Sequence, residues 1–173
     1  MLLAILVIAA TSAALPDSDV LANVQAGRMI CSNPNDAAKT CSTISRYELR
    51  DDGTLNEISE ILFSLDQPIS FEVQAHATLE NGAVCGAMLQ SDLNRGVVRL
   101  NGTPLSPDRN KAVIAKLEEK MAPLFGRRAC EILRMEEGRL LKFGQMDGID
   151  IPLPPKPVRW ITQDQGFRVA PAG

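Results

Sequence analysis

The chain has 173 residues, and 18 Lys and Arg against 21 Asp and Glu give a net charge of −3 with the single histidine neutral. A chain of this length usually forms one domain with its own core, and the mildly acidic balance argues against a protein that binds a nucleic-acid backbone. After residue 14 no apolar run approaches the ~20 residues of a membrane-spanning helix.

The N-terminal residues have the composition of a secretion leader. Twelve of the first 14 residues are apolar, none is charged, and small residues occupy the last three positions of the stretch. Pro16 prevents a helix from continuing. We expect a signal peptide over 1–14, cleaved after Ala14, a single disulfide-stabilised domain over 15–173, and a periplasmic or secreted protein. The alternative is a short buried N-terminal helix or strand.

Two local patterns follow the leader. Ser18 and Gly27 bracket a short helix that we expect over 19–26. Further along, the turn formers at 51–53 predict a β-hairpin.

The hairpin has two possible registers. A three-residue loop sets Leu49 opposite Leu55. A two-residue loop sets Glu48 opposite Glu57, and like charges directly opposed are unfavourable. We therefore prefer the three-residue loop.

The clearest strand pattern covers 69–80, where apolar and polar residues alternate for twelve residues. The Asn-Gly pair that follows predicts a two-residue turn, after which 83–88 returns along the strand. In this register Thr78 meets Cys85. Cys85 then lies on the polar face, and a partner cysteine would have to cross that face.

The long helix is expected over 107–121, because Ser106 can cap it, a proline stands at its first position and Pro123 ends it. A further helical turn is expected over 91–96 and a short strand over 97–101. Later strands are expected over 130–135, 140–146, 158–162 and 167–170.

These elements predict an α+β fold, in which an antiparallel β-sheet of hairpins packs on the one long helix and a short N-terminal helix lies beside it. The helix is expected to bury the face of the central strand that carries Ile69, Phe71, Val73 and Leu79.

Four prolines, Pro152, Pro154, Pro155 and Pro157, precede Trp160. Such a run favours an extended conformation. It could be a docking segment that presents Trp160. We favour a stiff connector that leads to a last edge strand.

The four cysteines indicate disulfides, because an even number in an exported chain favours pairing. No C-x-x-C spacing is present for a zinc site or a thioredoxin-type site. Three connectivities are possible. The bridge Cys31–Cys41 is favoured because it closes a loop rich in turn formers, and it leaves Cys85–Cys130.

Catalytic and cofactor motifs are absent from the sequence, so we expect no catalytic, cofactor-binding or metal-binding residue. One histidine excludes two-histidine metal sites. His76 is the single candidate general base, and Glu72 on the same strand face is ~13 Å away along the strand. Glu57 and Glu60 stand three apart on a strand and face opposite sides, which weakens them as a glycosidase pair.

Six short motifs are spread over most of the chain after the leader. They are Gly27-Arg28-Met29-x-Cys31, Lys39-Thr40-Cys41, Ala83-Val84-Cys85-Gly86, Met121-Ala122-Pro123, Arg159-Trp160 and Gly166-Phe167-Arg168-Val169-Ala170-Pro171. Together they resemble an uncharacterised group of small exported proteins from alphaproteobacteria. The resemblance implies a periplasmic or secreted location and two disulfides, and it implies no activity.

Two classes of function remain. The first, which we favour, is an exported, non-enzymatic binding module for a protein, a peptide or an envelope component, including an inhibitor. The second is a small secreted hydrolase built around His76 and nearby carboxylates. They differ in whether His76 lies in a concave pocket within reach of an acid or on an open sheet face.

Overall fold

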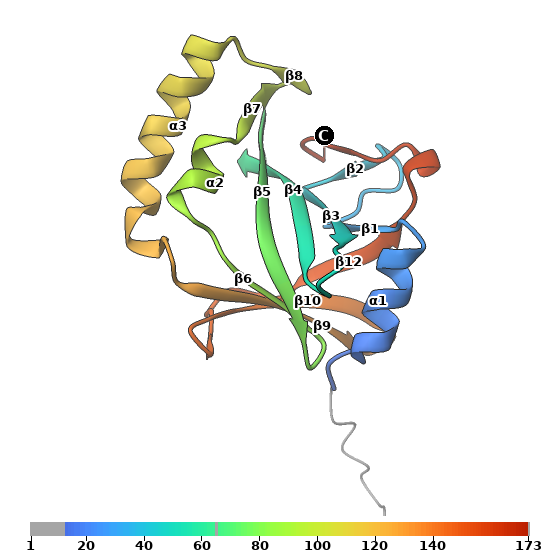
Figure 1. The fold of residues 1–173 in the computed structure, drawn as a ribbon. Coiled ribbons are helices and arrows are strands. Elements are labelled where there is room, and N and C mark those ends of the chain that lie inside the picture. Colours follow the sequence, from blue (N-terminus) through green and yellow to red (C-terminus); the bar gives the residue numbers. More distant parts are fainter. Residues whose placement is uncertain (1–12, 65, 173) are drawn as a thin grey trace, which may run out of the picture.

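The main β-strands form a closed barrel (Figure 1). The computed structural model describes residues 13–64 and 66–172, so the predicted leader falls almost entirely outside the described residues. The barrel strands are β1 (Met29–Ser32), β3 (Thr43–Leu49), β4 (Leu55–Ser64), β5 (Gln67–Glu80), β6 (Ala83–Ala87), β9 (Arg128–Glu136), β10 (Arg139–Met146) and β12 (Lys156–Ile161). They neighbour one another in the order β4-β3-β1-β12-β10-β9-β6-β5, and β4 pairs with β5 to close the ring. Every one of these pairings is antiparallel.

The barrel corrects the predicted α+β fold, in which a sheet of hairpins packed on one long helix (107–121). The protein is mostly β, with eight antiparallel strands closed on themselves. Closure depends on the β1–β12 and β6–β9 pairings, which join segments far apart in the chain. Turn signals report only neighbouring strands, so they could not show it.

Both predicted hairpin registers are confirmed. Leu49 lies opposite Leu55 across the three-residue loop. Thr78 lies opposite Cys85 across the Asn-Gly turn, whose asparagine has φ 53° and whose glycine has φ 76°. A type I′ turn requires positive φ at both of these positions, which explains the choice of residues.

The two disulfides, Cys31–Cys41 and Cys85–Cys130, are those predicted. The expectation that a segment crosses the polar face to reach Cys85 is wrong. Cys85 on β6 lies directly opposite Cys130 on β9, so the bridge joins neighbouring strands of the same sheet. Two disulfides are typical of proteins that fold in an oxidising compartment.

The strand that was predicted to be a last edge strand is not at an edge, because it is part of the barrel wall. β12 pairs with β1 on one side and with β10 on the other. The prolines at 152–155 form the loop before it, and Pro157 is its second residue. Pro157 has no backbone N–H, and it stands where the pairing with β10 begins.

The short N-terminal helix, α1 (Asp17–Gln25), packs on one end of the barrel. Its buried Val20 and Val24 belong to the same core as the inward-facing Leu55 and Leu133. Close by, the backbone N–H of Gly82 in the β5–β6 turn donates to the carboxylate of Asp17. The helix therefore covers the end of the barrel at which this turn lies.

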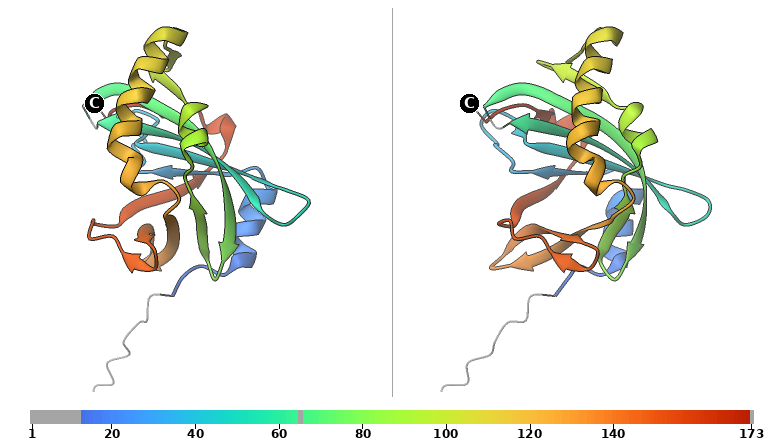
Figure 2. Two further views of the ribbon diagram at one scale, coloured as in Figure 1. Left: turned by 60° about the vertical axis from the view of Figure 1, so that its left-hand side comes forward. Right: turned by 90° about the vertical axis from the view of Figure 1, so that its left-hand side faces the viewer.

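A helical insertion between β6 and β9 stands away from α1 (Figure 2). It contains α2 (Gln90–Asn94), β7 (Val97–Leu100), β8 (Thr103–Pro104), α3 (Pro107–Met121) and the 3₁₀ turn η1 (Ala122–Leu124). β7 pairs with the first part of β5.

The insertion forms a second core with β5, in which Phe71 and Val73 pack with Ile114 of α3 and with Ile69. This confirms part of the prediction that this face of the strand packs on the long helix. Leu79 is the exception, since it packs in the barrel core.

The remaining elements are small. β2 (Thr40–Cys41) and β13 (Arg168–Val169) pair in parallel, β11 (Ile149–Asp150) pairs with β10, and a 3₁₀ turn, η2 (Gln163–Gln165), precedes β13. Among the residues that the structure describes, no helix is both long and apolar enough to span a membrane.

Candidate functional site

The strand registers identify the inward face of the barrel. Ser45 on β3 lies opposite Ser59 on β4, and Ser59 lies opposite Val73 on β5. In another part of the barrel, Val84 on β6 lies opposite Glu131 on the adjacent strand β9. Directly opposed residues of antiparallel strands share a face. The face that carries the buried core is the inside, so these side chains point into the barrel.

A cavity of about 260 Å³ lies on this inward face, and we call it the barrel chamber. It borders both cores, because its lining includes Val84 from the barrel core and Val73 and Met88 from the core of the insertion. Its polar lining residues are Thr43, Glu57, Ser59, Glu131, Lys142 and Lys156, together with His76, which also borders a hollow on the outer surface.

Glu57 is the acid on the β4 wall of the chamber. The Ser59 hydroxyl donates to its Oε1 at 2.7 Å, and the buried Ser45 hydroxyl lies 2.6 Å from that of Ser59. Burial raises the pKa of Glu57 to about 7, and the negative charge of Glu131 adds to this effect. The Ser59 hydrogen bond and Lys142 oppose it. Glu57 therefore changes charge near neutral pH.

Lys142 and Glu131 form the other wall. The Lys142 side chain is 8% exposed, and its Nζ donates to Oε1 of Glu131 at 2.7 Å. The second oxygen of Glu131, Oε2, is buried and has no hydrogen-bond partner among the described residues. Burying a carboxylate oxygen without a hydrogen-bond donor costs folding free energy. The chamber therefore contains an acceptor that a donor from a bound molecule could satisfy.

Tyr47 lies opposite Glu57 on β3 and is also inward-facing. It is 4% exposed, and within the described part of the chain its hydroxyl has no hydrogen-bond partner. Burial raises the pKa of Tyr47 well above its ordinary value, and the charges of Glu57 and Glu131 raise it further. The phenol therefore stays neutral and lies within the field of both carboxylates.

The buried group carries a net charge of −1 when Glu57 is ionised, from two carboxylates and one ammonium, and it is neutral when Glu57 holds its proton. Residues 13–64 and 66–172 contain no cluster of three or more His, Cys, Asp or Glu side chains that could hold a metal ion. The arrangement is suited to binding a small polar molecule through hydrogen bonds and charge.

The chain matches no protein-family model, no curated protein and no solved structure.

His76, the histidine considered as a general base, is exposed and points to the outside of the barrel. Its Nδ1 lies 3.4 Å from Nη1 of Arg50. Both side chains line an open hollow on the outer surface. The imidazole thus has a cation beside it. Asp52 lines the same hollow, but its carboxylate pairs with Arg50, and no acid in the described part of the chain is hydrogen-bonded to His76. Glu60 points outward and Glu57 inward, so the two do not form a catalytic pair.

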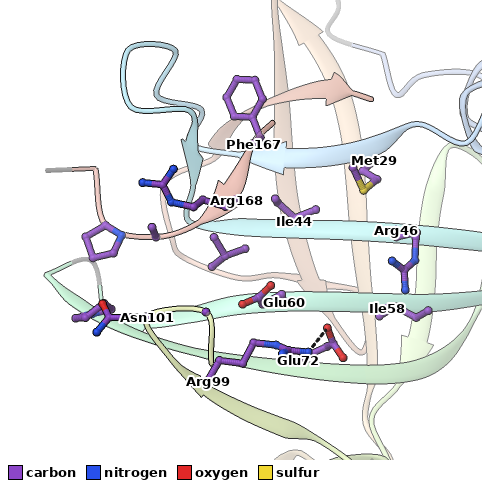
Figure 3. Close-up of a pocket in the computed structure, with 15 residues that line it drawn as sticks. Met29, Ile44, Arg46, Ile58, Glu60, Glu72, Arg99, Asn101, Phe167 and Arg168 are labelled. Carbon is purple, nitrogen blue, oxygen red and sulfur yellow. Dashed lines mark hydrogen bonds and ion pairs between the residues drawn. The ribbon is translucent and has the colours of Figure 1, made fainter. Parts of the chain in front are cut away.

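A second hollow, of about 690 Å³, lies on the outer face of β3 and β4 (Figure 3). The C-terminal segment and the β7–β8 turn line it on opposite sides, Ile44 lies beside Arg168, and Ile58 lies farther along the sheet, close to Arg46. Its charges are largely matched, because Arg99 pairs with Glu72 at 3.1 Å and Ser70 donates to Glu60 at 2.5 Å. Unlike the barrel chamber, it has no buried side-chain polar atom without a hydrogen-bond partner among the described residues that line it.

The sequence analysis considered Glu57 only as half of a catalytic pair, and it missed Glu131 and Lys142. Glu131 and Lys142 stand on different strands, and each is flanked by residues that fit an ordinary half-exposed strand. The one available signal was a charged residue on an apolar face, as at Glu57 between Leu55 and Ser59. Without knowledge of the closed barrel, that face reads as exposed to solvent.

Proposed function

We propose that this protein is an exported binding module that holds a small polar molecule in the barrel chamber. The observation that carries the proposal is the group of Glu57, Glu131 and Lys142 beside a cavity, in which Lys142 is buried, Glu57 and Glu131 are half-buried, and the buried Oε2 of Glu131 is an unused acceptor. Burying charged groups reduces stability unless they are fully paired. A bound ligand that completes their hydrogen bonds would offset this loss of stability.

The size of the site favours a small molecule over a peptide or a protein. Eight-stranded barrels are just wide enough to be filled by side chains or to hold one small ligand. At about 260 Å³ the chamber lies at the small end of ligand sites. The hydrolase built on His76 has no support, since Arg50 is the group beside the imidazole.

The periplasmic or secreted location is part of the same proposal. Two disulfides and the apolar leader support it. Cleavage after Ala14 would leave Leu15 at the new N-terminus, where its nitrogen donates to the Leu133 carbonyl. The intact mass of the exported protein tests the cleavage, and a product that retains residues 1–14 would contradict it.

Binding is tested by adding a library of small polar molecules to the ¹⁵N-labelled, disulfide-bonded protein. We expect at least one compound to shift the amide signals of Glu57, Glu131 and Lys142. Ala75→Leu adds bulk to the chamber wall and should abolish these shifts, whereas Ala112→Leu adds the same bulk on the exposed surface of α3 and should not. Absence of any binder, or binding that persists in Ala75→Leu, would contradict the proposal.

A further inference from the structure

We infer that the group recognised in the barrel chamber is a small organic ammonium ion, held between the carboxylates of Glu57 and Glu131. This inference deepens the proposed binding function and rests on it. Its first support is the number of unused acceptors. Each carboxylate has about four lone-pair sites. Of these, Glu57 receives one hydrogen bond from Ser59 and Glu131 one from Lys142.

A second observation concerns Tyr47, which lies opposite Glu57. The hydroxyl of Tyr47 is buried, has no hydrogen-bond partner among the described residues, and lies within the field of both carboxylates. Tyr47 does not line the chamber, so its hydroxyl belongs to the polar surroundings of the acids, and the unused acceptor that an ammonium group in the chamber can satisfy is Oε2 of Glu131.

The charge of the site favours a cation over an anion. Glu57 and Glu131 interact as like charges, and Lys142 balances only one of them. Lys156 also lines the chamber, but its side chain is exposed. A bound cation brings the buried group from −1 to neutral. A bound anion would be repelled by two carboxylates at close range.

The rest of the lining limits the molecule that carries the ammonium group. Beside the acids, β5 and β6 contribute the apolar Val73, Ala75 and Val84. In a cavity of about 260 Å³ these side chains can accommodate a short aliphatic part. A short alkylamine therefore fits both the charged and the apolar parts of the chamber.

Binding of a cation is coupled to the proton on Glu57. The charged or titratable groups that face Glu57 or line the chamber with it are Tyr47, His76, Glu131, Lys142 and Lys156, from β3, β5, β9, β10 and β12. A cation favours the ionised form of Glu57, whose pKa is about 7 in the free protein. Binding at pH 6 therefore has to expel a proton, whereas at pH 8 the site is already ionised. Linkage gives a dissociation constant about tenfold lower at pH 8 than at pH 6.

The test uses three probes of similar size and different charge: butylamine, butan-1-ol and butyrate. Each is titrated into the ¹⁵N-labelled, disulfide-bonded protein at pH 6 and pH 8. Butylamine is a cation at both pH values, like a lysine side chain. We expect butylamine alone to shift the amide signals of Glu57, Glu131 and Lys142, with about tenfold tighter binding at pH 8.

Variants identify the groups responsible. Glu131→Gln removes one carboxylate and should weaken butylamine binding about tenfold or more, whereas Glu119→Gln, on the exposed face of α3, should leave it unchanged. If Glu131→Gln does not fold, the pH dependence of the unmodified protein remains a test that needs no variant.

The outcomes separate the ligand class from the binding function. Shifts at the chamber with butan-1-ol or butyrate, but not with butylamine, would overturn the ammonium inference and leave the binding function standing. Butylamine binding that is equal at pH 6 and pH 8, or unchanged in Glu131→Gln, would also overturn it. If none of the three probes binds, the ammonium inference fails, and the binding function is decided by the separate library.

Discussion

Glu57→Gln offers the sharpest test of the electrostatics inside the barrel. The substitution keeps the size of the side chain and the oxygen that accepts from Ser59, and it removes the titratable group. The folded protein holds the Glu57 proton up to a pKa of about 7, compared with 4.5 for the ordinary side chain. The difference of 7 − 4.5, or about 2.5 units, corresponds to at most about 3 kcal/mol.

The sign follows from proton binding. Between about pH 4.5 and pH 7 the folded state binds more protons at this site than the unfolded state, so the stability of the wild type falls as pH rises through this window. Below pH 4.5 the cost is absent, and above pH 7 it is fully present. Glu57→Gln has no such cost. Relative to the wild type, the variant should therefore gain up to about 3 kcal/mol between pH 4.5 and pH 8.

Urea unfolding followed by the fluorescence of Trp160, at half-unit steps from pH 4.5 to pH 8, measures this difference. Glu119→Gln, an exposed position on α3, corrects for the loss of one negative charge. A gap between Glu57→Gln and the wild type that stays constant across the window, or that narrows as pH rises, would refute the reasoning.

Three further predictions concern the chamber and the two cores. Lys142→Met leaves Glu131 without its ion-pair partner. Because the Glu131 side chain is 37% exposed, we expect a loss of about 1–2 kcal/mol in urea unfolding, which lies between the values for exposed and for buried pairs. NMR titration should also show a higher pKa for Glu57, which Lys142 holds down. Replacing both cysteines of the β6–β9 disulfide should lower the melting temperature more than replacing both cysteines of the β1–β2 disulfide. The first closes 45 residues and the second 10, which correspond to about 4 and about 3 kcal/mol of loop-closure entropy. Equal losses of melting temperature in calorimetry would contradict this. Gly96→Ala should destabilise the core of the insertion by about 1–3 kcal/mol, because a Cβ there would lie 2.2 Å from the Phe71 ring; an unchanged urea midpoint would show that the ring can move.

The sequence predicted what adjacent residues decide. Turn residues at 51–53 and 81–82 determined two hairpin registers, and a proline at the first helical position marked the start of α3. The disulfides also followed, because one bridge closes a short loop and leaves a single pair. These features depend on contacts that are close in the chain or on elimination.

Barrel closure and the chamber could not be predicted in this way. Two polar residues on an alternating strand look the same whether the strand faces solvent or a cavity. The pairing of Lys142 with Glu131 needs the β9–β10 register, and the proximity of Glu131 to Glu57 needs the closed ring. The β9–β10 register is that of a hairpin closed by a turn at 137–138, but the closed ring depends on long-range strand pairing, which hydrophobic periodicity does not reveal.

The order of strands around the barrel has a consequence for how the chain acquires its function. Within the ring, β3 to β6 form one run of sequence neighbours, and β9 and β10 form another. Two pairings within the ring join the early part of the chain to the late part: β6–β9, and β1–β12, where Met29 meets Ile161, 132 residues away. We call these two pairings the seams; outside the ring, β2 and β13 also pair. Such distant pairings are expected to form late in folding.

The charged residues of the chamber come from both sides of these seams. Glu57 belongs to the early part, and Glu131 and Lys142 belong to the late part, so the proposed binding site is assembled only once the ring is complete. A molecule in the chamber would bind the folded state alone and stabilise it by mass action. By contacting Glu57 from the early part of the chain and Glu131 from the late part, it would help to hold the two parts together. The β1–β12 pairing would benefit from this, since neither disulfide links those two strands.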